Sequence, residues 1–309
     1  MSLIGAFMGS GATGFGYSST AEAVSDGVDL SGKTFLLTGC SSGLGAETLR
    51  VLGLRGAHVF ALARSEEKAQ ASLEHSGASG TPVACDLADP DSVRAAVLTV
   101  KRAGRSLDGM IANAGIMALP KLQLLHGYEA QFFTNHVGHF ILVTGVLDQL
   151  ADDGRVVIVS SSGHKAAPSG GIAFDNLDGA KGYSSWRAYG QSKLANLLFA
   201  KHLATRFDKP KQTANALHPG VIETNLGRHM NAAFRASLSL GQPLFAKNVA
   251  EGAATQCFLA TNPKGADTNG EYFSNCNVAK TSRHGRDAEL AKKLWERTEA
   301  IVEKLPRRS

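Results

Sequence analysis

The sequence alternates between short apolar runs and amphipathic stretches from residue 33 onward, and this alternation constrains the fold more than any other feature. Short apolar runs predict buried strands, and the amphipathic stretches between them predict helices. The pattern therefore predicts an α/β chain in which a doubly wound parallel sheet of the Rossmann type carries helices on both faces. The expected strands are residues 34–38, 58–63, 83–85, 107–113, 156–160, 213–217 and 271–273, and the expected helices are 46–54, 66–75, 91–103, 128–150, 188–207 and 248–262.

A single domain over residues 31–309 is the simplest organisation, because 309 residues with 43% hydrophobic content can bury a large core. Residues 1–30 are rich in Gly, Ser and Ala, and we expect them to form a flexible arm or an extended strap. They contain no Arg, which argues against a targeting peptide. No apolar run reaches the roughly 18 residues of a transmembrane helix. We expect a soluble, cytoplasmic protein without evident organelle targeting.

The charge and the cysteines exclude several classes of function. The formal charge is +5 and the pI is near 9.0, but Lys and Arg are dispersed, which does not predict nucleic-acid binding. An anionic nucleotide cofactor suits this charge better. The cysteines fall singly, so the sequence predicts neither a disulfide framework nor a structural metal, and a reducing compartment is expected. They are Cys40, Cys85, Cys257 and Cys276.

A glycine-rich turn over residues 38–45 follows the first expected strand and precedes the first helix. In this context glycine lets a pyrophosphate approach the backbone, and the helix N-terminus supplies N–H groups to the anion. The alternative is a tight turn without a ligand. The position after the first strand of an alternating pattern favours a phosphate site. Its expected binding residues are Gly39, Ser41, Ser42, Gly43, Leu44 and Gly45.

The end of the second expected strand indicates which dinucleotide is bound. NAD-binding Rossmann proteins usually place an acidic residue there, whereas this chain has Arg64. A guanidinium can bind a 2′-phosphate with paired, charge-assisted hydrogen bonds, so Arg64 favours NADP(H), with Lys68 assisting and NAD(H) still possible. The alternative for Arg64 is an ordinary surface position. After the third strand, Asp86 and Leu87 are expected beside the adenine ring, although Asp86 could simply cap a local turn.

A tyrosine and a lysine four residues apart indicate the chemistry. On a helix, Tyr189 and Lys193 share a face, so the ammonium lies beside the phenol. A nearby cation and an oxidised nicotinamide would lower the tyrosine pKa, as general acid/base catalysis requires. Such a pair also occurs by chance on helix surfaces. Its position after the glycine-rich turn and after Ser161, which follows an apolar strand, favours a hydride-transfer site.

With these motifs, nearly the whole chain resembles the short-chain dehydrogenase/reductase family. Within that family it is similar to the branch of retinol dehydrogenases and WW-domain oxidoreductases. It is also similar to the plant chloroplast-envelope translocon dehydrogenase type. The likeness extends to the N-terminal arm, which suggests that the arm packs against the body. One motif departs slightly, since Ala112 stands where Asn is common. The matching motifs are Thr38-Gly39-x-x-x-Gly43-x-Gly45, Asn113-Ala114-Gly115, Asn135-His136-Val137-Gly138-His139, Val159-Ser160-Ser161, Tyr189-x-x-x-Lys193 and Pro219-Gly220 with Thr224.

The resemblance implies a role for each matching residue. Tyr189 would exchange the proton of the reacting oxygen, and Ser161 would hydrogen-bond that oxygen, with Ser160 and Ser162 as other possible donors. Lys193 would hold the nicotinamide ribose and lower the tyrosine pKa, and Asn135 would hold a water that links the lysine to solvent. The remaining cofactor contacts would come from Asn113, Ala114, Gly115, Pro219, Gly220 and Thr224; Thr224 could instead be an N-cap.

Two histidines, His136 and His139, stand three residues apart and could by spacing alone bind a metal. No third ligand occupies a convincing position, and both belong to a family motif. Packing or hydrogen bonding is therefore the expected role, and no metal is predicted.

The substrate is less clearly indicated. One wall of a substrate pocket could be formed by Gly170-Gly171, Phe174, Tyr183 and Trp186. A second wall could be formed by apolar residues after Thr224, within a lid around residues 225–248. Packing in the protein core is the alternative for most of these residues. The resemblance implies a hydrophobic aldehyde, ketone or alcohol as substrate and allows a homodimer. An NADP(H)-binding redox sensor or scaffold is the main alternative. A sugar-nucleotide epimerase or dehydratase is disfavoured because its larger C-terminal domain is not apparent. The apolar residues of the second wall are Leu226, Met230, Phe234, Leu238, Leu240, Leu244 and Phe245.

Overall fold

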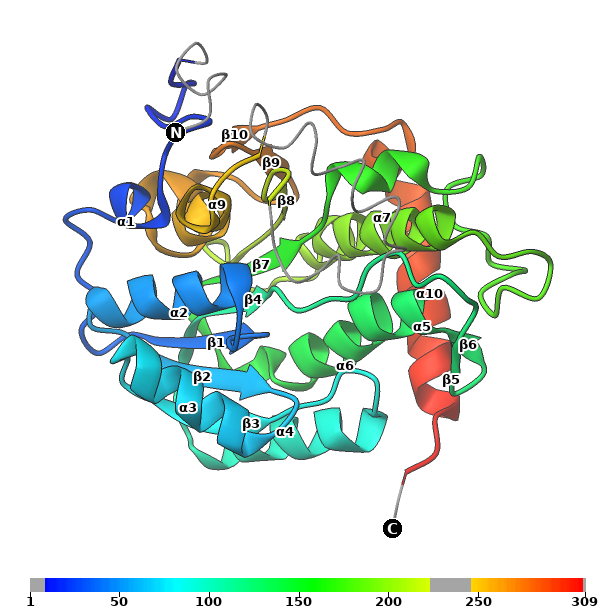
Figure 1. The fold of residues 1–309 in the computed structure, drawn as a ribbon, viewed down its shortest axis with the longest axis horizontal. Helices are drawn as coiled ribbons and strands as arrows, with labels where there is room; N and C mark the ends of the chain where they lie inside the picture. The colour runs from blue at the N-terminus through cyan, green and yellow to red at the C-terminus, as the bar shows by residue number, and fades with distance from the viewer. Residues whose placement is uncertain (1–8, 223–245, 308–309) are drawn as a thin grey trace.

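A mixed sheet of eight strands, ordered β10-β9-β8-β7-β4-β1-β2-β3, runs through the computed structural model, which describes residues 9–222 and 246–307 (Figure 1). Every neighbouring pair is parallel except β9 and β10. The strands are β1 (Thr34–Thr38), β2 (His58–Ala63), β3 (Gly80–Ala84), β4 (Leu107–Ala112), β7 (Leu150–Val159), β8 (Thr213–His218), β9 (Tyr272–Ser274) and β10 (Asn277–Val278); β5 (Leu124–Leu125) and β6 (Tyr128–Glu129) form a separate hairpin.

Helices cover both faces of the sheet, because side chains alternate along each strand and both faces are apolar. Leu36 of β1 joins one core with α4, α6, α7 and α10, and Leu37 joins the other with α1, α2, α3 and α9. The expected doubly wound fold is therefore confirmed. The α-helices are α1 (Ala21–Val24), α2 (Gly43–Leu54), α3 (Glu66–Ser76), α4 (Pro90–Arg102), α5 (Ala130–Phe132), α6 (Gly138–Gly145), α7 (Ser185–Leu203), α9 (Val249–Thr261) and α10 (Ala288–Lys304). None of the helices within the described ranges has the length and apolar character needed to span a bilayer.

The strand order reverses between β1 and β4, which are neighbours in the sheet. From β1 the chain proceeds outward to β2 and β3, and then returns to β4 and continues in the opposite direction through β7 and β8. The connections that leave the carboxyl ends of β1 and β4 therefore diverge and open a crevice, which is where open α/β sheets bind their ligands.

The segment 128–150, expected to be one helix, is broken into several elements. Glu129 ends β6 and its carboxylate accepts a hydrogen bond from the Phe132 backbone, which starts α5. A π-helical turn, η1 (Phe133–Val137), then separates α5 from α6, and a 3-10 turn, η2 (Leu147–Gln149), leads directly into β7. Hydrophobic periodicity could not reveal these changes, because nearly every residue of η1 and α6 is buried.

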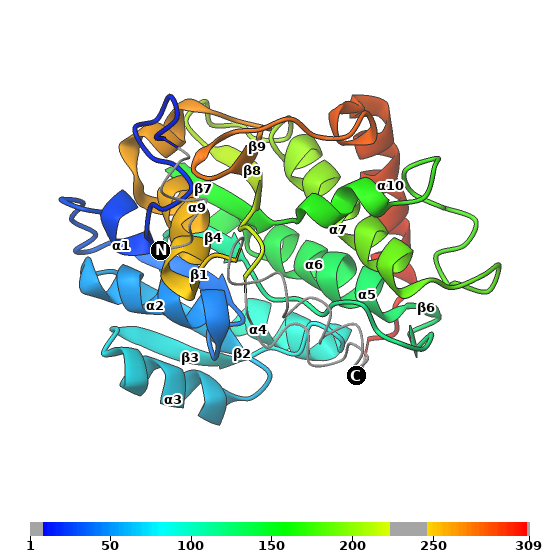
Figure 2. The ribbon, with the colours of Figure 1, turned by 45° about the horizontal axis from the view of Figure 1, so that its top comes forward.

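The N-terminal segment packs along α9 and the β9–β10 edge, and Figures 1 and 2 both show α1 beside α9. The backbone N–H of Thr13 donates to the Asn277 side chain at 3.1 Å, and the same side chain donates to the Phe15 carbonyl at 2.9 Å. The ring of Phe15 meets that of Phe258 at 5.7 Å. Asn262 donates to the carbonyl of Val24, just after α9. Residues 13–24 thus form a strap held by backbone and side-chain contacts.

Candidate active site

Ser161 and Tyr189 meet just beyond the carboxyl end of β7. Ser161 is the N-cap of the 3-10 turn η3 (Ser162–Ala166), and its hydroxyl accepts a hydrogen bond from the Gly163 backbone at 3.0 Å. The same hydroxyl hydrogen-bonds Tyr189, which lies one turn into α7 and is 5% exposed. Of the three adjacent serines, Ser160 instead donates to the Lys193 carbonyl at 2.6 Å, and Ser162 is exposed.

Lys193 lies one helical turn after Tyr189 and is buried beside it. Its ammonium nitrogen is 5.9 Å from the centre of the Tyr189 ring and donates to the Val159 carbonyl at 3.0 Å. Burial lowers the pKa of Lys193 to about 8. The sequence predicted a lowered pKa for Tyr189 beside a cation and an oxidised nicotinamide. In the structure, burial raises the pKa of Tyr189, and the hydrogen bond with Ser161 opposes this rise. Desolvation of the phenolate therefore outweighs the stabilisation expected from the neighbouring lysine.

Asn135 reaches the same place from the π-helical turn η1. Its side chain accepts from the Ile116 backbone N–H at 2.8 Å and donates to the Ile116 carbonyl and to Ser192, each at 2.9 Å. A Cβ at Gly115 would lie 3.1 Å from the Asn135 oxygen and 3.5 Å from the Lys193 nitrogen. The structure thus brings Asn135, Ser161, Tyr189 and Lys193 to one end of the sheet, from three different segments.

The glycine-rich turn lies beside this cluster, at the carboxyl end of β1. Gly39 and Gly43 have positive φ values of 71° and 54°, and a Cβ at Gly45 would overlap the Gly39 carbonyl. The turn is therefore too tight for other residues. Asn113, after β4, donates to the Thr38 carbonyl at 2.9 Å and so ties β4 to the turn. Ser41 and Ser42 are exposed, whereas Leu44 is half-buried.

The Thr38 hydroxyl organises three segments around the turn. It accepts hydrogen bonds from the backbone of Asn113 at 2.9 Å and Ala114 at 3.0 Å. Nδ1 of His139 donates a hydrogen bond to the Asn135 carbonyl, so the neutral ring has its acceptor at Nε2. The Thr38 hydroxyl therefore donates a hydrogen bond to Nε2 of His139 at 2.9 Å. Burial lowers the pKa of His139 to about 4, which keeps the ring neutral.

His136 is buried among the rings of Phe132 and Phe199 and is hydrogen-bonded to α10. Thr298 donates its proton to the Leu294 carbonyl, so Nε2 of His136 must donate to the Thr298 oxygen at 2.9 Å. Within the described residues, no three His, Cys, Asp or Glu side chains gather as metal ligands would. Each of the four cysteines, all in the described part of the chain, is buried and unpaired.

The residues expected at the adenine end of the cofactor occupy the adjoining strand ends. Arg64 directly follows β2, and both Arg64 and Lys68 are exposed. Asp86 accepts from the Ala88 backbone at 3.0 Å in a local turn, and Leu87 is buried. Pro219 and Gly220 follow β8, and Gly220 has a φ of +108°. Thr224 and residues 225–245 of the expected lid lie outside the described residues.

Of the first expected substrate wall, which the structure describes in full, Trp186 lies against Tyr189. Its ring meets that of Tyr189 edge-on at 6.1 Å, and 37% of its surface is exposed. Tyr183 donates its hydroxyl proton to the Leu119 carbonyl at 2.6 Å, so it braces a loop. Phe174 lies beneath the Lys293 ammonium at 4.8 Å, and Gly171 packs against α10.

Sequence reasoning missed His164, which lies directly behind Ser161. Its Nδ1 donates to the Ser161 carbonyl at 2.7 Å, and its Nε2 accepts from the Ser282 backbone at 3.1 Å. Its position three residues after the serine was visible in the sequence. Its partner Ser282, however, comes from a loop 118 residues away along the chain.

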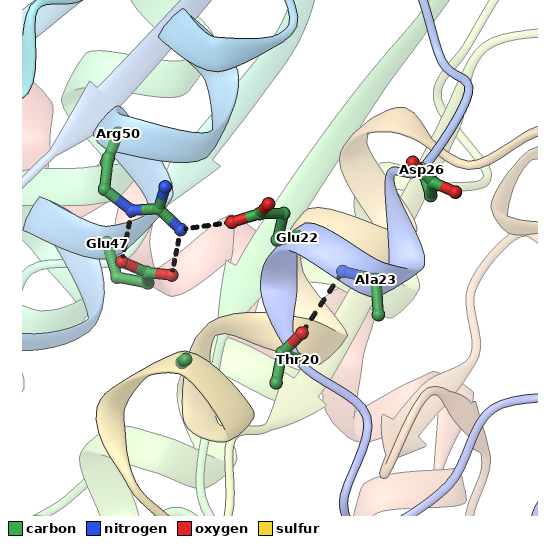
Figure 3. A pocket seen from close by; sticks show the side chains of 7 residues that line it. Thr20, Glu22, Ala23, Asp26, Glu47 and Arg50 are labelled. Carbon is green, nitrogen blue, oxygen red and sulfur yellow. Dashed lines mark hydrogen bonds and ion pairs between the residues drawn. The ribbon is translucent and has the colours of Figure 1, made fainter.

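A separate groove of about 450 Å³ lies between α1, α2 and α9 (Figure 3). Arg50 of α2 pairs there with Glu22 at 3.0 Å and with Glu47 at 2.9 Å. The acidic side chains outnumber this one guanidinium, and none of Asn135, Ser161, Tyr189 and Lys193 lines the groove. The groove is therefore a salt-bridged contact between the strap and α2.

The doubly wound sheet, with a glycine-rich turn at its crevice, defines an α/β protein of the Rossmann type, and comparisons with known proteins identify its family. The family model described as "short chain dehydrogenase" matches residues 33–234. The chain is 38% identical to "Short-chain dehydrogenase TIC 32 A, chloroplastic" of Brassica napus, over 96% of this chain and 97% of that protein. It is 35% identical to retinol dehydrogenase 14 of Homo sapiens, over 88% and 86% of the two chains.

Among solved structures, a short chain dehydrogenase from Burkholderia cenocepacia in complex with NADP superposes with a TM-score of 0.64. It is 27% identical and covers 79% of this chain and 96% of its own. The chain belongs to the short-chain dehydrogenase/reductase family. It is an NAD(P)-dependent oxidoreductase that acts on CH–OH or C=O groups.

Proposed function

We propose that the protein is an NADP(H)-dependent enzyme that interconverts a hydrophobic aldehyde or ketone and its alcohol. The observation that carries this proposal is the meeting of Ser161, Tyr189 and Lys193 beside the glycine-rich turn, with Asn135 behind the lysine. A protein that only bound the nucleotide would need the turn but not these four side chains together. Residues 31–309 would form the catalytic unit, and residues 1–30 the arm.

The strand ends fit a dinucleotide. The backbone at Gly39 and Gly45 leaves no room for a Cβ, which is typical of a pyrophosphate cradle. Gly115 lies next to Asn135 and Lys193, where the nicotinamide ribose would be held, and Gly220 would lie beside the nicotinamide ring. The other contacts would come from Ser41, Ser42, Gly43, Leu44, Asp86, Leu87, Asn113, Ala114, Pro219 and Thr224.

NADP(H) is favoured because Arg64 and Lys68 are exposed at the carboxyl end of β2, where no acidic side chain directly follows the strand. A guanidinium can form a forked, charge-assisted contact with a 2′-phosphate. The Burkholderia relative, whose structure contains NADP, supports the same preference. We expect NAD(H) to bind more weakly.

In the reduction, a nicotinamide held at this site would supply a hydride to the carbonyl carbon. Tyr189 gives its phenolic proton to the carbonyl oxygen, so that an alcohol and the oxidised cofactor result. Ser161 donates a hydrogen bond to the same oxygen and stabilises its developing negative charge. Lys193 uses one of its donors on Val159, which leaves others for the ribose. Asn135 would hold a water through which the lysine and tyrosine regain a proton.

The substrate class is proposed from Trp186 and from the relatives. An exposed indole against the catalytic phenol offers an apolar surface beside the reacting oxygen. The relative named retinol dehydrogenase 14 is named for an apolar alcohol, which supports the same class. Small hydrophilic carbonyl compounds would gain little from such a surface.

The possible homodimer would pair through the helices that carry Asn135 and Tyr189. Helix α10 already packs across this surface (Figure 1), and Trp295 contacts Phe140 at 4.8 Å and Phe199 at 5.7 Å. A dimer formed in that way would require α10 to move. We therefore propose that the protein does not pair through these helices.

The test is NADPH oxidation with a panel of retinoid, lipid and aromatic aldehydes and ketones, using the wild type, Tyr189→Phe and the control Tyr128→Phe, at a half-buried tyrosine of the β5–β6 hairpin. We expect Tyr189→Phe to lower kcat by about 10²–10⁴-fold with little change in the Kd for NADPH. Tyr128→Phe should behave as wild type. Wild-type protein that binds NADPH but turns over none of the panel would favour the redox sensor or scaffold instead.

A further inference from the structure

Lys247 is a buried cation that the proposed chemistry does not use. Its side chain is 1% exposed, and its ammonium has no hydrogen-bond partner among the residues that the structure describes. Its backbone is fixed at both sides: its N–H donates to the Val221 carbonyl at 2.9 Å, and the next residue, Asn248, caps α9. A buried ammonium without such a partner needs another source of stabilisation.

An aromatic ring of the N-terminal strap supplies that stabilisation. The Lys247 ammonium lies 4.7 Å from the centre of the Tyr17 ring, within the range of a cation–π contact. Such contacts strengthen when the cation is withdrawn from water. Burial lowers the pKa of Lys247, and the nearby Glu251 in the first turn of α9 opposes that lowering.

The stem of the same lysine lies under the proposed nicotinamide loop. A Cβ at Gly220 would lie 2.8 Å from Cδ and 3.3 Å from Cε of Lys247. The φ of +108° at Gly220 is one that glycine adopts without strain and that a residue with a Cβ rarely adopts, and the lysine stem fills the space that such a Cβ would need. Lys247 therefore touches the strap with its ammonium and the loop after β8 with its stem.

The strap that carries Tyr17 is held in place independently of this contact. Thr13 is bonded to Asn277, Phe15 packs on Phe258, and Lys264 donates to the Thr13 carbonyl at 2.8 Å. These anchors lie on β10, α9 and the turn η5 (Pro263–Asp267). The matched family region begins at residue 33, so Tyr17 lies outside it.

We propose that Tyr17 and Lys247 are positioning residues for the cofactor, through which the N-terminal strap holds the Gly220 loop in its binding conformation. The inference rests on the proposed NADP(H) site. Neither residue would touch the reacting atoms, so their loss should weaken cofactor binding and leave the catalytic step of the bound complex nearly unchanged.

The test is the Kd for NADPH, measured by fluorescence with the full chain, for Tyr17→Leu, Tyr17→Phe, Lys247→Met and the double variant Tyr17→Leu/Lys247→Met. We expect Tyr17→Leu and Lys247→Met each to raise the Kd by about two- to thirtyfold, the range that positioning residues produce. Tyr17→Phe keeps the ring face and should bind NADPH as wild type. The double variant should be no weaker than the worse single variant, because both changes break one contact.

Two comparisons separate this role from simple packing. Tyr128→Leu removes a half-buried tyrosine elsewhere, so it should lower the melting temperature without raising the Kd. At saturating NADPH, kcat of the Tyr17 and Lys247 variants should stay within about twofold of wild type. Unchanged Kd values in both single variants, or effects that multiply in the double variant, would overturn the inference while leaving the proposed function intact. Wild type that binds no NADPH would overturn both.

Discussion

The ammonium of Lys193 donates a hydrogen bond to the carbonyl oxygen of Val159, two residues before Ser161, at 3.0 Å. The last residue of β7 thus fixes the lysine relative to the serine that follows it. Ser160, between them, closes a second link by donating to the Lys193 carbonyl at 2.6 Å. The carboxyl end of β7 is therefore joined to α7 by two hydrogen bonds, one to the side chain and one to the backbone of Lys193.

Lys193 should make NADPH binding depend on pH. Because burial lowers its pKa to about 8, the free protein loses the lysine charge as the pH rises through that value. We expect the Kd for NADPH to increase between pH 7 and pH 9, by up to about tenfold per unit above the pKa. Fluorescence titrations across this range check it. In Lys193→Met the Kd should be higher and nearly flat, and an equal slope in the variant would assign the titration to another group.

His164 should act on catalysis through Ser161. In His164→Ala the Ser161 carbonyl loses its 2.7 Å donor, so the serine hydroxyl would no longer be held toward Tyr189. We expect kcat to fall about tenfold, equivalent to about 1.4 kcal/mol, with an unchanged Kd for NADPH. Steady-state kinetics in the Ser161→Ala background provide the check. There, a further tenfold loss on adding His164→Ala would contradict a role through Ser161.

Gly190 should tolerate no side chain. Its Cβ would lie 2.8 Å from the backbone of Ala166, Ala167 and Gly163, so α7 could not approach η3 so closely. Gly190→Ala should lower the free energy of unfolding by about 1–3 kcal/mol and displace Tyr189 from Ser161. Gly170 is the matched control, because no atom lies within 4 Å of its Cβ position. Urea unfolding of the two variants should show a loss for Gly190→Ala alone.

Arg64 should decide between the two dinucleotides. Arg64→Ala removes the proposed donor to the 2′-phosphate, and we expect the Kd for NADPH to rise about 10- to 100-fold while that for NADH stays the same. Arg102 is an exposed arginine at the end of α4, and Arg102→Ala is the control for a general loss of positive charge. Equal weakening of both cofactors by Arg64→Ala would show that this residue does not read the phosphate.

Helix α10 should keep the protein monomeric. Light scattering after gel filtration should give a mass near the 32.4 kDa of one chain. Trp295→Ala removes the ring that packs on Phe140 and Phe199 and should cost about 3–5 kcal/mol of stability. A stable species of twice the mass, with α10 still protected from proteolysis, would contradict this expectation.

Most of the sheet could be predicted from the sequence, because its strands are short apolar runs bounded by turns. Even so, β7 begins at Leu150 rather than near residue 156, because the polar and glycine residues 152–155 interrupt its apolar pattern. The alternation of strands and helices did not predict α10, because this amphipathic helix follows the last strand. The π-helical turn around Asn135 depends on tertiary packing that periodicity does not report.

The site residues could be identified because each belongs to a local motif. Their mutual geometry could not be predicted, since it depends on contacts such as Asn135 with Ile116 and His164 with Ser282. The same limit explains the pKa of Tyr189. A neighbouring lysine can be read from spacing, but the degree of burial that outweighs it is set by the whole fold.

The strap joins the beginning of the chain to its end. Thr13 bonds to Asn277, 264 residues later, so the docking site does not exist until the last part of the chain has been made. At about 5–20 residues per second, a ribosome needs on the order of 13–50 s to add that length. During synthesis, Ala21 and Val24, which are buried in the finished protein, cannot pack against α9 until residues 249–261 have been made. The strap is therefore made long before the part of the chain on which it docks.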